Sequence, residues 1–254
     1  MLAAALAFRL IIAYAYPGTG LSFDLASFQG WAANLADEGL HGFYERPFFH
    51  DYTPGYLYVL YLVGVVADTF HIALDQLIKL PAIFADVAIG WLVWSMATEL
   101  GASRRAALVA AGLAVANPVS WFDSVTWGQV DSFGVVFLLL GVRDLWRDRP
   151  ERAAIWTVIA ALIKPQLAIL VPVVAVVTIR RALWPARPPE AATGEAAEAS
   201  IGEATSGGLL SRLRAWDRRT DHPIRILTTG VAALVMTFVL CAPFGLSVIE
   251  LRDG

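Results

Sequence analysis

The sequence predicts an all-α, polytopic transmembrane helical bundle. Hydrophobic residues occupy 57% of the 254 positions and charged residues only 16%, whereas a soluble domain carries about 25% charged residues. Mean hydropathy is +0.60, and the apolar residues form separate runs instead of the alternating pattern of half-buried strands. Helices satisfy every backbone hydrogen bond within a bilayer. We therefore expect a membrane protein built from helices.

About eight spans are predicted, give or take one. Several of the apolar runs are shorter than the roughly 20 residues that a helix needs to cross a bilayer at right angles. Weakly polar flanks that are buried in the bundle can extend the short runs. The runs cover residues 2–16, 53–67, 80–98, 106–118, 130–142, 153–163, 167–179 and 226–246.

Composition divides the chain into four parts. Residues 1–183 are expected to form a transmembrane core with a long external loop at 17–52. Residues 184–223, rich in Ala, Glu, Gly, Ser and Thr, are expected to form a flexible cytoplasmic linker. A further transmembrane helix is predicted at 224–247. Residues 248–254 begin an external loop that the sequence cuts short, so we expect the front part of a longer protein.

The basic residues predict the orientation of the spans. Lys and Arg gather between apolar runs, and the positive-inside rule places such clusters on the cytoplasmic side. The loop 17–52, whose only basic residue is Arg46, and the connection 117–131 are then both external. Three apolar runs lie between these two segments, although only an even number of crossings returns a chain to the same side. Either one run does not cross, or Arg104 and Arg105 face outward.

Charge and cysteine content exclude several classes of function. The net charge of −3 and the scattered basic clusters do not provide a surface for nucleic acid. The single cysteine, Cys241, lies in an apolar run and can form neither a disulfide framework nor a multi-cysteine metal site. The four histidines lack the spacing of metal ligands. No metal ligand and no certain cofactor is therefore assigned.

Acidic residues beside the apolar runs are the first candidates for chemistry. An ionisable group at mid-membrane costs roughly 2.5–3.5 kcal/mol, so it is retained where it is paired or functional. Asp24 follows the first run, where a helix leaving the bilayer places a carboxylate at the outer interface, although it could also cap a loop helix. Asp51 and Tyr52 precede the Thr53-Pro54-Gly55 start of the next run. Asp51 could cap that helix or face a substrate.

The connection at 117–131 carries an unusual density of polar groups. It contains Asn117-Pro118, Asp123, Trp127-Gly128-Gln129 and Asp131. Two carboxylates and an amide can hold a sugar by hydrogen bonds, bind a divalent cation or help to place a base. Asp131 could instead cap the helix that follows. We favour a functional role for this group, with a divalent cation as an open alternative.

Lys164-Pro165-Gln166 interrupts two short apolar runs. A cation at this tip could meet the phosphate of a membrane-anchored donor. Alternatively, Lys164 could extend its aliphatic stem along the bundle and keep its ammonium in water. The residues alone leave both interpretations open.

A second pair of charges lies within the apolar runs themselves. Arg9 is in the first run and Asp86 is in the run 80–98. Opposite charges inside a membrane bundle commonly pair with each other. We expect these two residues to neutralise each other, in a structural and not a catalytic role.

Taken in order, these motifs resemble those of bacterial GT-C glycosyltransferases. The set comprises an Asp after the first span, an aromatic loop ending in Asp51-Tyr52-Thr53-Pro54-Gly55-Tyr56, the Asn-Pro to Trp-Gly-Gln-Val-Asp-Ser segment at 117–132, and Lys164-Pro165-Gln166. Relatives in that superfamily include mannosyltransferases of GPI-anchor synthesis, dolichol-linked-oligosaccharide glucosyltransferases and protein O-mannosyltransferases. The resemblance covers about residues 1–180 and the following span.

The resemblance implies transfer of a mannose-like hexose from a polyprenyl phosphate to an acceptor hydroxyl at the outer face of a bacterial inner membrane. Asp24 matches the acidic residue that serves such enzymes as general base, so inversion at the anomeric carbon is expected. Lys164 is expected to meet the donor phosphate. The expected partners are the lipid-linked donor, membrane lipids and a glycan, lipid or protein acceptor. The other expected substrate-binding residues are Asp51, Tyr52, Asp123, Gln129, Asp131 and Gln166.

Two other functions remain open. A transporter or flippase of sugar-linked lipids would also place Asp and Lys residues and Pro-broken helices along a substrate path. Against that function, the charged tips all lie toward one side, whereas alternating access favours a site near the midplane. A non-catalytic membrane scaffold would need the same residues only for folding.

Overall fold

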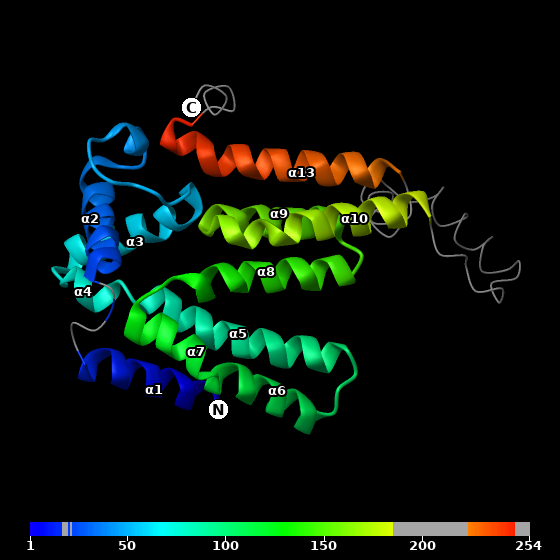
Figure 1. Cartoon of the computed structure of the whole chain (residues 1–254), viewed down its shortest axis with the longest axis horizontal. Helices are drawn as coiled ribbons and strands as arrows, with labels where there is room; N and C mark the ends of the chain where they lie inside the picture. Colours follow the sequence, from blue (N-terminus) through cyan, green and yellow to red (C-terminus); the bar gives the residue numbers. More distant parts are fainter. Residues whose placement is uncertain (17–19, 21, 185–222, 247–254) are drawn as a thin grey trace, which may run out of the picture.

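The computed structural model describes residues 1–16, 20, 22–184 and 223–246. Within these residues the chain forms helices and turns with no strand, which confirms the all-α prediction. In Figure 1 the long helices run roughly parallel to one another. They are α1 (Leu2–Ala15), α5 (Leu80–Glu99), α6 (Arg104–Ala116), α8 (Asp131–Trp146), α9 (Pro150–Ile163), α10 (Leu170–Leu183) and α13 (Ile224–Cys241). The predicted linker 184–223, except for its two end residues, and the predicted loop 248–254 lie outside the described part of the chain.

Three further helices cover one end of this bundle. They are α2 (Ser22–Glu38), α3 (Pro54–Phe70) and the single turn α4 (Leu74–Leu77), and α2 lies across the direction of the long helices (Figure 1). Gly64 allows α3 to contact α2 directly, because a Cβ at this position would lie 2.1 Å from the carbonyl oxygen of Ala32. The predicted external loop therefore contains a helix that packs on α3. We call these three helices the end cap.

The position of α3 accounts for the conflict in the predicted crossings. Since α3 lies in the end cap, only α5 and α6 run away from that end of the bundle and return to it (Figure 1). The helix formed by the apolar run 53–67 is therefore not one of the long parallel helices, and the described residues of 17–52 lie at the same end of the bundle as 117–131. The α5–α6 connection and the start of α6, which carries Arg104 and Arg105, lie at the opposite end.

Four helical stretches in the described residues are long and apolar enough to cross a membrane. They are Leu74–Glu99, Arg104–Trp127, Pro165–Leu183 and Ile224–Phe244. The predicted count of about eight is not confirmed, since α1, α8 and α9 contain only 14, 16 and 14 residues.

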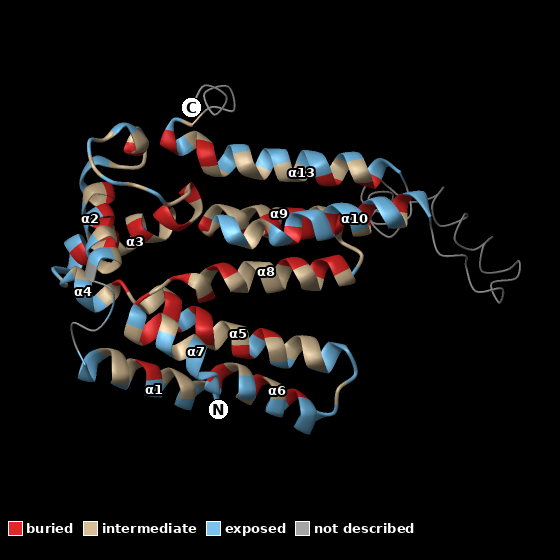
Figure 2. Ribbon diagram, in the orientation of Figure 1, coloured by how far each residue is buried: buried red, intermediate tan, exposed pale blue. Residues whose placement is uncertain are grey.

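The exposed faces of the long helices are apolar. Figure 2 shows long exposed stretches on α13 and α10, where the exposed residues include Leu234, Phe238 and Val176. A helix that presents large apolar side chains outward is suited to contact with lipid acyl chains. The described structure is that of a membrane protein.

A buried ion pair joins the N-terminal helix to the bundle, as the sequence predicted. Arg9 Nε lies 2.8 Å from Asp86 Oδ2, with side-chain exposures of 1% and 0%. The Arg9 guanidinium also donates to the carbonyl of Val115 at 2.8 Å. Asp86 accepts further hydrogen bonds from Ser120 at 2.8 Å, Ser124 at 2.6 Å and Ser132. This cluster connects α1, α5, α6 and α8 to the segment 117–131.

Candidate active site

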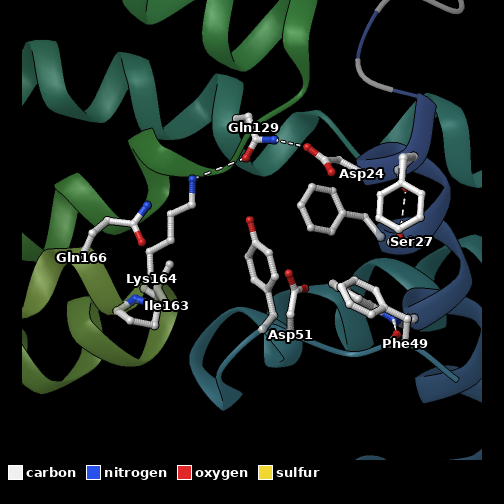
Figure 3. Close-up of a pocket in the computed structure, with 13 residues that line it drawn as sticks. Asp24, Ser27, Phe49, Asp51, Gln129, Ile163, Lys164 and Gln166 are labelled. Atoms are coloured by element: carbon white, nitrogen blue, oxygen red, sulfur yellow. Dashed lines mark hydrogen bonds between the residues drawn. The ribbon is translucent and has the colours of Figure 1, made fainter. Parts of the chain in front are cut away.

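A cavity of about 390 Å³ lies between the end cap and the ends of the long helices (Figure 3). Its walls come from α2, from the chain that leads into α3, from the turn before α8 and from the break between α9 and α10. Six of the eight residues predicted for the site line it. The complete lining is Phe23, Asp24, Ser27, Phe28, Trp31, Phe49, Asp51, Tyr52, Gln129, Ile163, Lys164, Pro165 and Gln166.

One face of α2 forms the first wall. Asp24, Ser27, Phe28 and Trp31 follow the i, i+3, i+4, i+7 spacing that brings side chains to the same side of a helix. Asp24 lies half-buried in the first turn, and its Oδ2 accepts a hydrogen bond from Gln129 Nε2 at 2.5 Å. Its carboxylate is therefore directed at another segment of the site and is not confined to capping its own helix.

The start of α3 forms the second wall and is fastened to the end of α9. Thr53 donates its hydroxyl to the carbonyl of Leu162 at 2.7 Å. A Cβ on Gly55 would lie 2.5 Å from the same carbonyl group, so glycine is needed for this approach. Asp51 and Tyr52 are thereby held in the same cavity as Lys164. The N-cap of α3 is Thr53, so Asp51 does not cap that helix.

Gly128 brings the third wall up to α2. Its φ of 84° lies in the left-handed region, and a Cβ would lie 2.6 Å from the Leu25 side chain of α2. The N–H groups of Gly128 and Gln129 both donate to the carbonyl of Asp123 at 2.9 Å. This turn ends the π-helical segment η2 (Phe122–Trp127) and places Gln129 beside Asp24.

Lys164 forms the fourth wall, where α9 ends and a short 3-10 helix, η3 (Pro165–Ile169), begins. Its Nζ lies 2.6 Å from Asp131 Oδ2 and 2.7 Å from Asp131 Oδ1, and its side chain is 14% exposed. The ammonium is therefore held within the site, and the snorkelling alternative is not supported. Asp131 pairs with this lysine and makes no side-chain cap to α8.

These contacts form one continuous chain of hydrogen bonds. Lys164 donates to Gln129 Oε1 at 3.4 Å, and Gln129 in turn donates to Asp24 (Figure 3). With the Lys164–Asp131 ion pair, four of the predicted residues are connected. The carboxylate of Asp123 does not line the cavity, so its role in binding a substrate stays a prediction.

Tyr52 adds a hydroxyl donor to the cavity. Burial, followed by the charges of Asp131, Asp51 and Asp24, raises the pKa of this hydroxyl above its ordinary value. Both causes disfavour the phenolate. Tyr52 is therefore protonated throughout the neutral range and can donate a hydrogen bond to a substrate oxygen.

Sequence reasoning missed the phenylalanine and tryptophan side chains of the cavity. Phe23 and Phe49 lie with their ring centroids 5.7 Å apart and are 65% and 57% exposed. The Trp31 indole donates to the carbonyl of Phe49 at 2.8 Å, which holds this segment against α2. If α2 had been predicted as a helix, the helical spacing from Asp24 would have identified Phe28 and Trp31 as residues of the same face. The position of Phe49 depends on tertiary contacts.

The described residues contain no group of three or more His, Cys, Asp or Glu side chains placed to hold a metal ion. Asp123 and Asp131, for which the sequence left a divalent cation open, do not belong to such a cluster. Asp131 pairs with Lys164 instead.

Comparison with known proteins gives one family. The family described as alpha-(1->6)-mannopyranosyltransferase, N-terminal domain, matches residues 49–180, just over half of the chain. The chain belongs to this family. No curated protein and no solved structure matched it.

Membership of the mannopyranosyltransferase family identifies the chain as a GT-C mannosyltransferase-like membrane protein with glycosyltransferase activity. It favours the enzyme over the transporter and the scaffold. A sugar donor and an acceptor are implied. The matched residues include every predicted site residue from Asp51 to Gln166, whereas Asp24 precedes the match. The role of Asp24 therefore depends on its place in the cavity.

Proposed function

We propose that this protein transfers a mannosyl residue from a polyprenyl phosphate to an acceptor hydroxyl, with inversion at the anomeric carbon and with Asp24 as general base. The observation that carries the proposal is the placement of Asp24 and Lys164 in the walls of one cavity. The carboxylate can take the proton that the acceptor hydroxyl loses. The cation can stabilise the negative charge that develops on the leaving phosphate.

The proposed reaction is a single displacement. The acceptor hydroxyl gives its proton to Asp24 Oδ1, and its oxygen attacks the anomeric carbon of the donor. The bond from that carbon to the phosphate oxygen breaks, and the lipid phosphate leaves with the bonding electrons. No group among the described residues donates to Asp24 Oδ1, so this oxygen is available for the acceptor. Lys164 would stabilise the negative charge on the leaving phosphate.

The family name supports a more specific product. An alpha-(1->6) linkage joins the anomeric carbon of the transferred mannose to the 6-hydroxyl of an acceptor sugar. A single displacement that gives an α product requires a β-linked donor. We therefore propose a β-mannosyl polyprenyl phosphate as donor and a glycan with a free 6-hydroxyl as acceptor.

The arrangement of the basic residues supports an outward-facing site. Arg104, Arg147 and Arg180 lie near the ends of α6, α8 and α10 that are remote from the end cap (Figure 1). The positive-inside rule assigns that end to the cytoplasm. The cavity then opens at the outer face, which we propose to be that of a bacterial inner membrane, where a lipid-linked donor is accessible.

The donor is tested with the full-length protein in liposomes, supplied with radiolabelled β-mannosyl polyprenyl phosphate or with a nucleotide-linked mannose. We expect transfer from the lipid-linked donor alone. Replacing the Lys164 ammonium by an apolar side chain (Lys164→Met) should lower kcat/KM for this donor on the order of 10²-fold, because a fixed positive charge no longer faces the leaving phosphate. Lys164→Arg should retain more activity than Lys164→Met.

Arg105→Met is the matched control for charge removal. Arg105 is an exposed cation at the start of α6, at the opposite end of the bundle, so its loss should leave transfer unchanged. Efficient transfer from the nucleotide sugar, or an unchanged kcat/KM in Lys164→Met, would contradict the proposed donor site.

A further inference from the structure

The side-chain amide of Gln129 bridges two charged groups of opposite sign. Its Nε2 donates to Asp24 Oδ2 at 2.5 Å, and its Oε1 accepts from Lys164 Nζ at 3.4 Å. Figure 3 shows Gln129 between Asp24 and Lys164, with both contacts drawn. The amide thus commits one of its two N–H donors to the carboxylate and one lone pair of its oxygen to the ammonium.

The charges on the two sides fix the orientation of this amide. A carboxylate accepts hydrogen bonds only, and an ammonium donates only. Rotating the amide by 180° would set its oxygen against the Asp24 carboxylate and its NH₂ group against the Lys164 ammonium. The observed orientation therefore satisfies both partners and the alternative satisfies neither. Gln129 can hold Asp24 in a single rotamer in a way that an apolar side chain of the same size cannot.

The backbone of Gln129 is also held in place. The Asp123 carbonyl accepts from its N–H, and the close packing of Gly128 on Leu25 brings the turn against α2. The amide is thus positioned from η2 and α8, whereas the carboxylate that it contacts belongs to the end cap. Gln129 connects the two parts of the fold that form the cavity.

We infer that Gln129 is a positioning residue that holds the Asp24 carboxylate by one oxygen and leaves the other oxygen directed to the acceptor hydroxyl. This inference rests on the proposed role of Asp24. Through its amide oxygen, Gln129 also links the position of Asp24 to Lys164, so that the proposed base and the cation for the leaving group are held in one fixed relation. The residue acts on the rate of transfer and not on the affinity for the donor.

The inference is tested by steady-state kinetics of the full-length protein in liposomes with β-mannosyl polyprenyl phosphate. Gln129→Leu should lower kcat on the order of 10²-fold, the loss that a misplacement of about 1 Å in a catalytic group can cause, with the donor KM within about twofold of wild type. Gln129→Glu is isosteric and keeps the oxygen that faces Lys164, but it sets a second negative charge against Asp24. This variant should lower kcat at least as much as Gln129→Leu does, although its side chain has nearly the same volume as that of glutamine.

Gln76→Leu is the matched control. Gln76 is an exposed glutamine of α4 that does not line the cavity, and its replacement should leave both kinetic constants unchanged. In an Asp24→Asn background, Gln129→Leu should lower the residual rate no further, because two residues that act as one unit are not additive.

Three results would overturn the inference. A Gln129→Leu variant with wild-type kcat and a raised donor KM would make Gln129 a substrate contact. Wild-type activity in Gln129→Glu would show that its amide N–H is not needed by Asp24. Additive losses in the double variant would separate Gln129 from Asp24. Transfer at the wild-type rate by Asp24→Asn would contradict the proposed role of Asp24 as the base. An inactive Asp24→Asn variant together with a fully active Gln129→Leu variant would contradict only the positioning role of Gln129.

Discussion

Replacing Asp24 by Asn is expected to lower mannosyl transfer on the order of 10³-fold, the usual contribution of a positioned general base. The amide is nearly isosteric with the carboxylate, and its oxygen can still accept the hydrogen bond from Gln129. It cannot take the proton of an acceptor hydroxyl. Binding of the lipid-linked donor should therefore change little. It can be measured without acceptor, so that no transfer takes place.

Asp37→Asn supplies the control for this variant. Asp37 lies on the same helix, is exposed and does not line the cavity, so the same chemical change there should have no effect on transfer. Asp24→Glu, which keeps the carboxylate but displaces it, should retain a small part of the activity. Transfer at the wild-type rate by Asp24→Asn would remove this residue from the mechanism.

The largest effect on stability is expected at the buried ion pair. Asp86→Leu leaves the Arg9 guanidinium without its counterion in an environment where both side chains are almost completely buried. Removing one partner of such a pair typically costs about 3–5 kcal/mol. It also removes the acceptor shared by three serines. Thermal unfolding in detergent should show a large decrease in Tm.

A double replacement separates the charge from the packing. In Arg9→Met/Asp86→Leu no buried charge is left unpaired, and exchanges of this kind are often neutral or stabilising. The double variant should recover most of the lost stability, with only the serine hydrogen bonds missing. A Tm of Asp86→Leu close to that of wild type, or a double variant no more stable than the single one, would show that the pair is not what holds α1 to the bundle.

The sequence was sufficient for those features that depend on residue type and order. Opposite charges in two apolar runs predicted the Arg9–Asp86 contact, and the proline after Lys164 predicted the break between α9 and α10. The order of the motifs predicted six residues that line one cavity. These inferences need no knowledge of how the helices are arranged.

Features that depend on tertiary packing could not be obtained in this way. The run 53–67 is as apolar as a membrane span, and its place in the end cap follows from the contact of Gly64 with α2. Likewise, the sequence does not indicate which of Asp123 and Asp131 contacts Lys164. Only the fold directs Asp131 to Lys164 while the carbonyl of Asp123 closes the turn before Gln129.

The stereochemistry of the product tests most directly whether one cavity supports a single displacement, with a base on one side and a leaving phosphate on the other. The full-length protein in liposomes would be supplied with β-mannosyl polyprenyl phosphate and an acceptor glycan, and the anomeric configuration of the new linkage would be determined by NMR. An α linkage is the predicted result, because one displacement inverts the anomeric carbon. A β linkage from this donor would require two displacements and would contradict the assignment of Asp24 as a general base.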